Sequence, residues 1–170
     1  MLTKKKLLTK WGIYALVMVL LFAAQQLFLD PIVLSPMGAS PFLAPMLVAV
    51  VAALEGPTEG TLFGTAAGIL CDLSGHGVFS GVYTFSFFCI ALLVAIIAYW
   101  VMRNVFGSIV YALIAFAVID LIQILYLTAL HGAALSAALP LAGREIAVSI
   151  VFVIPIFFLY NALHKRFRFE

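Results

Sequence analysis

Residues 55–73 read EGPTEGTLFGTAAGILCDL, and this stretch decides the expected fold. Glycine recurs at every fourth position and an aspartate takes the next step: Gly56, Gly60, Gly64, Gly68 and Asp72. Positions four apart lie almost above one another on a helix, so the pattern predicts a groove of bare backbone ending in a carboxylate. Glycine inside a helix costs about 1 kcal/mol relative to alanine, but in a bilayer it lets helices approach closely. We interpret the groove as a seam on which other helices, or a partner, pack.

The composition around this stretch is that of a membrane protein. The 170 residues are 66% hydrophobic and only 9% charged, whereas a soluble domain carries about 25% charged residues. Too few polar groups remain to cover a water-facing surface, so we expect an all-α, polytopic integral membrane protein. Cys71 and Cys89 lie in apolar runs without a CxxC or Cys/His spacing, which favours buried apolar side chains over a disulfide or a metal site. The sequence contains no catalytic or cofactor-binding motif, and we expect neither an enzyme nor a cofactor.

Six apolar runs predict six transmembrane helices in a single domain that covers residues 1–170. The runs are residues 11–29, 41–54, 60–73, 81–102, 105–130 and 144–163. Loops are expected at residues 30–40, 74–80 and 131–143. Pro45 should begin or kink the second run, and Pro155 should kink the sixth. The first run is about one bilayer crossing long, and we interpret it as a retained span rather than a signal peptide.

The basic residues predict the orientation of these helices. If the N-terminus is cytoplasmic, eight of the nine lysines and arginines fall on the inner side, and only Arg144 falls on the outer side. This asymmetry favours cytoplasmic N- and C-termini with six crossings.

The two short runs 41–54 and 60–73 leave one ambiguity, because they form either two crossings or one re-entrant hairpin. A hairpin would bury Glu55 and Glu59 at membrane depth, at a cost of several kcal/mol unless they are protonated or paired. We favour two short spans, with both glutamates in a solvated turn at the inner face. Paired carboxylates can perform acid/base chemistry, but no histidine or lysine lies near them in the sequence.

Asp120 is the most costly residue in the chain, because it lies near the middle of the fifth run. Gln123 and Tyr126 follow at i+3 and i+6, on roughly the same helix face. The group is either a ligand or proton site, or an interhelical hydrogen-bond cluster with no further role. We favour the second interpretation.

Residues 55–87 resemble the central signature of the MreD family of bacterial rod-shape-determining membrane proteins. That family carries a glycine-rich segment ending in Gly-x-x-x-Asp, then a short loop, then Gly-x-x-Tyr/Leu at the start of the next span. The corresponding residues here are Gly60, Gly64, Gly68, Asp72, Gly81 and Tyr83, with one residue rather than two between Gly81 and Tyr83. Over the remaining residues the resemblance is one of length, topology and hydropathy.

The resemblance implies a non-enzymatic scaffold of the cell-elongation complex, which makes peptidoglycan at the bacterial plasma membrane. The implied partners are a MreC-like single-span protein and, through it, the RodA glycosyltransferase, a class B transpeptidase and MreB filaments. Membrane lipids are also expected partners, and nucleic acid is not.

The MreD family is also similar in architecture to the S components of energy-coupling-factor vitamin transporters, which supplies the alternative. That reading predicts a substrate pocket in the bilayer, with Asp120 or Arg144 contacting the ligand and loops 30–40 and 73–80 as a lid. It also requires small residues at four-residue spacing on the first span. Ala15 and Ala23 are instead eight apart with Val19 between them, which counts against this alternative.

Overall fold

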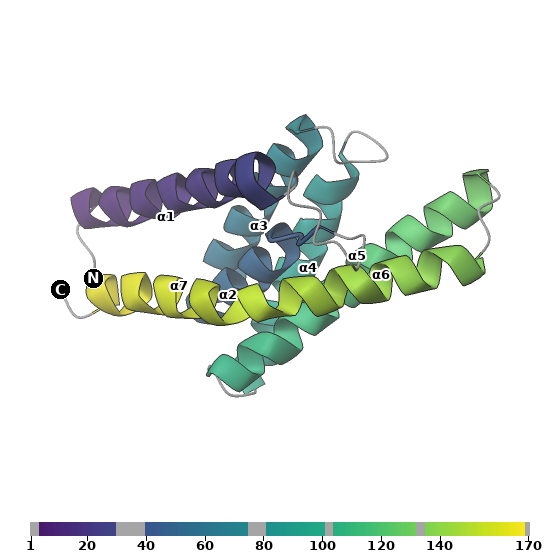
Figure 1. Ribbon diagram of the computed structural model, residues 1–170. Helices are drawn as coiled ribbons and strands as arrows, with labels where there is room; N and C mark the ends of the chain where they lie inside the picture. Colours follow the sequence, from purple (N-terminus) through teal and green to yellow (C-terminus); the bar gives the residue numbers. More distant parts are fainter. Residues whose placement is uncertain (1–3, 30–39, 75–80, 101–103, 132–134, 169–170) are drawn as a thin grey trace.

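A computed structural model describes residues 4–29, 40–74, 81–100, 104–131 and 135–168 (Figure 1). The described residues are almost entirely helical and contain no strand, which confirms the all-α prediction. In chain order the elements are α1 (Lys4–Ala24), the π-helical turn η1 (Gln25–Leu29), α2 (Ala44–Glu55), α3 (Pro57–Leu73), α4 (Val82–Trp100), α5 (Val105–His131), α6 (Leu135–Ser149), the 3-10 turn η2 (Ile150–Phe152) and α7 (Val153–Arg168).

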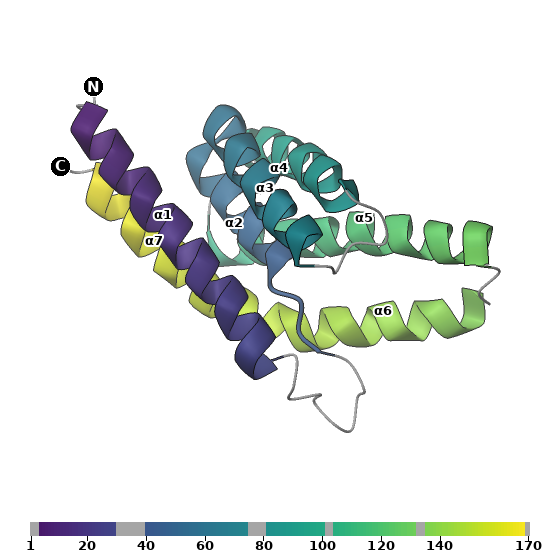
Figure 2. The same ribbon diagram turned by 90° about the horizontal axis from the view of Figure 1, so that it is seen from above.

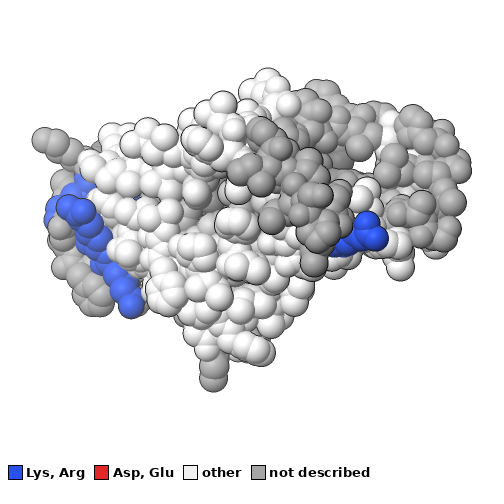
Figure 3. Space-filling model, in the orientation of Figure 1, with Lys and Arg blue, Asp and Glu red and all other residues white. Residues whose placement is uncertain are grey.

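Four helical segments are long and apolar enough to cross a membrane, as expected for a multi-pass membrane protein. They are Lys6–Leu29, Val82–Trp100, Val105–Tyr126 and Leu139–Phe167. Both chain ends lie at the same end of the molecule (Figure 1). Lysine and arginine side chains gather at that end, and a smaller basic patch lies toward the opposite end (Figure 3).

Helix α2 is the centre of the core. Its residues from Ala44 to Leu54 are all buried, and it packs against α3, α4, α5 and α7. In Figure 2 it lies between the α1–α7 pair and α4. Pro45 stands in its first turn, where the missing N–H is not needed, so this proline begins the helix. A helix that is apolar on all sides suits either a protein core or a membrane span, and the complete burial of α2 places it in the core.

The buried start of α2 is satisfied by side chains from distant helices. Residues 40–43 are not helical, so their N–H groups need other partners. The Phe42 N–H donates to Ser149 Oγ at 2.9 Å, and the Leu43 N–H donates to Gln25 Oε1 at 2.9 Å. Non-helical backbone is tolerated at membrane depth only where protein surrounds and satisfies it. Both polar side chains are themselves buried, which meets this condition.

The prediction of a loop over residues 131–143 is wrong for residues 135–143, which are helical. Helix α5 continues to His131 and α6 begins at Leu135; the expected loops 30–40 and 74–80 lie almost wholly outside the described residues. Alanine and leucine dominate this segment and have high helix propensities, which explains why residues 135–143 are helical. The expected run 144–163 therefore lies within a longer helical rod, α6–η2–α7, which bends in Figure 2. The 3-10 turn η2 precedes Pro155, which has no N–H to bond the Val151 carbonyl.

Candidate functional site

Three glycines of the repeat place α3 in backbone contact with α2 and α4. A Cβ built on Gly60 would lie 2.6 Å from Ala52 Cα. On Gly64 it would lie 2.8 Å from the Phe87 carbonyl oxygen, and on Gly68 it would lie 2.5 Å from Thr84 Cα. Carbon atoms do not approach so closely, so only glycine fits these three positions without a shift.

Gly56, the first glycine of the repeat, lies outside this contact. It forms the turn between α2 and α3 with a φ of +91°, and a Cβ there would meet nothing within 4 Å. A positive φ favours glycine for conformational rather than packing reasons. The seam therefore consists of Gly60, Gly64 and Gly68, and helices of the same chain fill it.

Asp72, which ends the repeat, caps the first turn of α4. Its Oδ1 accepts a hydrogen bond from the Tyr83 N–H at 3.2 Å. Its Oδ2 accepts from the Thr84 N–H at 3.0 Å and from Thr84 Oγ1 at 2.6 Å. The first N–H groups of a helix have no intrahelical partner, and a carboxylate suits the positive end of the helix dipole. Gly68, one turn earlier, lets α4 come close enough for this cap.

Asp72→Ala is expected to destabilise the protein by about 1 kcal/mol, the usual cost of losing a helix cap. Asp72→Asn should cost less, because its amide oxygen can still accept one of the bonds. Thermal denaturation in detergent and amide hydrogen exchange at Tyr83 and Thr84 measure the effect. Unchanged exchange at both amides in Asp72→Ala would contradict the capping role.

Glu55 forms a buried ion cluster where α1, the α2–α3 turn and α7 meet. Its carboxylate pairs with Lys10 Nζ, accepts a hydrogen bond from Tyr14 Oη at 2.5 Å and lies 2.8 Å from His164 Nδ1. Lys10 Nζ also lies 3.2 Å from Glu59 Oε2. The Glu55 side chain is 2% exposed, so the prediction of a solvated turn is wrong for Glu55, whereas Glu59 is 38% exposed.

The environment of Glu55 favours its charged form. Burial opposes ionisation, but the hydrogen bonds with His164, Lys10 and Tyr14 outweigh it and hold the pKa of Glu55 well below its usual range. Next to the cluster, the ring of Tyr14 packs edge to face against the rings of Phe63 and Tyr160, which also pack against each other. The cluster thus fastens the first and last helices to the α2–α3 turn.

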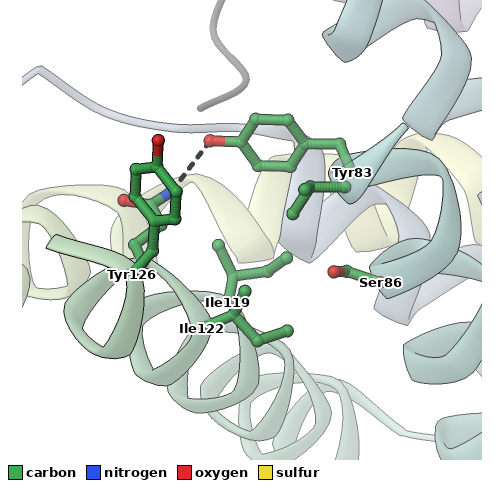
Figure 4. A pocket seen from close by; sticks show the side chains of 7 residues that line it. Tyr83, Ser86, Ile119, Ile122 and Tyr126 are labelled. Carbon is green, nitrogen blue, oxygen red and sulfur yellow. Dashed lines mark hydrogen bonds between the residues drawn. The ribbon is translucent and has the colours of Figure 1, made fainter. Parts of the chain in front are cut away.

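A pocket of about 100 Å³ lies between α4 and α5 (Figure 4). It is lined by Val82, Tyr83, Ser86, Ile119, Ile122, Gln123 and Tyr126. Gln123 Nε2 donates a hydrogen bond to Tyr83 Oη at 2.8 Å, drawn as a dashed line in Figure 4. Two members of the expected intramembrane cluster, Gln123 and Tyr126, therefore meet here with Tyr83 of the resemblance motif.

Asp120, the third member, is not among the pocket-lining residues. It is buried, with 7% of its surface exposed, and its Oδ2 has no hydrogen-bond partner among the described residues. Asp120 therefore lies outside the pocket lining that Gln123 and Tyr126 share.

The chain matches no known protein family, no curated protein and no solved structure. Any functional assignment therefore depends on its own residues and geometry.

Within the part of the chain that the structure describes, no three histidine, cysteine, aspartate or glutamate side chains gather to hold a metal ion.

Asp120→Asn is expected to leave stability within about 1 kcal/mol of the wild type, because the amide has nearly the same shape and volume as the carboxyl group that it replaces. Thermal denaturation in detergent measures this effect, and recovery of a bound partner measures function. A normally folded Asp120→Asn protein that loses all partner binding would contradict a purely structural role for Asp120.

Proposed function

We propose that this chain is a non-enzymatic membrane scaffold of the bacterial cell-elongation complex, as its resemblance to MreD implies. The observation that carries the proposal is the use of the motif residues. Gly60, Gly64 and Gly68 give close helix contact, and Asp72 caps α4. These residues pack and cap helices, so they keep the outer surface of the bundle in a fixed shape. A scaffold needs such a surface to hold its partners.

The proposed topology has six crossings with both termini on the cytoplasmic side. It is supported by Glu55 at the α2–α3 turn, which pairs with Lys10 near one terminus and His164 near the other. The length of the α6–η2–α7 rod also fits one crossing. Residues 144 to 165 are 21 steps of about 1.5 Å, or about 31 Å, which is close to the thickness of the hydrocarbon core. Arg144 and Lys165 then mark the outer and inner boundaries.

The proposed partner is a MreC-like single-span protein, which would link the scaffold to RodA, a class B transpeptidase and MreB filaments. A groove of about 320 Å³ between α1 and α3 supports a site for its helix. Exposed Ala15 and Ala66 lie in the groove, and small residues let helices approach closely. The α1 span is also the least buried of the four long spans, at 17%.

Co-expression with the MreC-like protein of the same genome, followed by mild-detergent purification and mass spectrometry, tests the proposal. We expect near one-to-one recovery of the two proteins. Ala66→Trp should reduce it by filling the groove, while Ala147→Trp, at an exposed alanine of α6, should not. Recovery of a stoichiometric vitamin-like molecule or an energy-coupling transporter subunit would overturn the scaffold role.

A further inference from the structure

The pocket between α4 and α5 lies at the depth of the outer leaflet in the orientation proposed above. Residues 105 to 126 of α5 are 21 steps of about 1.5 Å, or about 31 Å, so Tyr126 stands near the outer boundary when Val105 stands near the inner one. Ile119 lies seven residues before Tyr126, about 10 Å deeper along the helix. The pocket therefore runs from the headgroup boundary into the hydrocarbon.

The walls of the pocket suit hydrocarbon better than water or an ion. None of its seven lining residues is charged. The amide of Gln123 and the hydroxyl of Tyr83 are bonded to each other. A buried water needs two to four polar partners, and an apolar cavity stays dry. Figure 4 shows Ile119 and Ile122 of α5 and Ser86 of α4 reaching toward the space between the two helices.

The pocket is also accessible from the bilayer. Tyr83, Ser86 and Ile119 are buried and form its inner wall, whereas Val82, Ile122, Gln123 and Tyr126 are partly exposed. Its volume of about 100 Å³ is somewhat smaller than a cavity of about 150 Å³ that binds benzene, so it can hold a short piece of one chain. An empty cavity would forfeit the dispersion contacts of its walls.

We propose that this pocket binds the acyl chain of an outer-leaflet phospholipid, with Gln123 and Tyr126 at its headgroup end. Lipid is the most concentrated apolar molecule at this depth, and the pocket opens toward it. The bound chain fills the gap between α4 and α5 and acts as a fixed component of the fold. The inference rests on the proposed orientation and not on the scaffold role or on any protein partner.

Photolabelling of the purified protein in phosphatidylcholine nanodiscs tests this inference. A small fraction of the phosphatidylcholine carries a diazirine on one acyl chain, and mass spectrometry locates the labelled residues after irradiation. We expect labelling of residues 82–86 and 119–126 to exceed that of Leu92 and Leu93, which face outward elsewhere on α4, by severalfold.

Ile122→Trp should fill the pocket from its open side and reduce the labelling of residues 82–86 severalfold. Leu121→Trp, at the exposed neighbouring position outside the pocket, should leave it unchanged. If Ile122→Trp fails to fold, Val82→Trp fills the pocket from α4 instead. Uniform labelling of all outward-facing residues, or undiminished labelling in a folded filling variant, would overturn the proposal. No partner protein is present, so this outcome is separate from the co-purification result.

Discussion

Replacing Gly68 with leucine is expected to separate α3 from the start of α4 and to destabilise the protein by about 3 kcal/mol or more. A Cβ at this position would lie 2.5 Å from Thr84 Cα and 2.7 Å from the Tyr83 carbonyl oxygen. These are backbone atoms, which can move only if α4 moves. That movement also draws the Tyr83 and Thr84 N–H groups away from Asp72, so the cap is lost together with the packing. Thermal denaturation in detergent measures the loss.

Gly12→Leu is the matched control, because a Cβ at exposed Gly12 meets nothing within 4 Å. It should leave stability equal or slightly higher, since leucine has the better helix propensity. Gly68→Ala separates the effect of helix propensity from that of the steric clash. Alanine improves the helix propensity by about 1 kcal/mol, but its Cβ already makes the close contact with Thr84. A Gly68→Ala protein more stable than the wild type would show that α3 and α4 do not need this close approach.

The fold could be predicted where the signal is local. Composition identifies the membrane class, and runs 41–54 and 60–73 lie within a few residues of α2 and α3. The central position of α2 could not be predicted, because in a membrane protein the lipid-facing and core-facing sides of a helix are both apolar. The extension of α6 into residues 135–143 was missed because turn-forming residues outweighed the helix propensity of their neighbours.

The candidate sites also differ in whether their contacts are short-range or long-range in the sequence. The glycine seam follows from a four-residue spacing, and the Asp72 cap joins residues only 11 and 12 positions apart. Glu55, in contrast, meets Lys10 and His164 across 45 and 109 positions. Nothing in its neighbourhood indicates that contact. The available signal was that Lys10 and His164 flank the first and last expected spans, at ends that the charge pattern places on the same side of the membrane.

The buried ion cluster should produce the other large effect. Glu55→Leu leaves the Lys10 ammonium buried, with the Glu59 carboxylate at 3.2 Å as its remaining ion-pair partner among the described residues. Removing one partner of a buried pair typically costs about 3–5 kcal/mol, and the Glu59 carboxylate, which is 38% exposed, compensates the Lys10 charge only in part. Thermal denaturation in detergent should detect this loss, and Lys165→Met, at an exposed lysine of the same end, should have little effect.

The double variant Lys10→Met/Glu55→Leu should recover much of that loss, because an apolar pair of similar volume often matches a buried ion pair in stability. The two single changes are therefore expected to be strongly non-additive, as for residues in direct contact. Additive losses would mean that Lys10 and Glu55 contribute independently, and the cluster would not be the fastening between α1 and the α2–α3 turn.

The pH dependence of this cluster follows from the same contacts. The pKa of Glu55 is lower in the folded protein than in the unfolded chain, where a glutamate has a pKa of about 4.3. Its contribution to stability is therefore complete above about pH 4.3 and is lost as the pH falls through the folded pKa. The stability advantage of the wild type over Glu55→Gln should shrink as the pH falls below about 4. Taking the difference between the two proteins removes the titration of the other carboxylates, so an advantage that persists unchanged in acid would exclude an ionised Glu55 as the centre of the cluster.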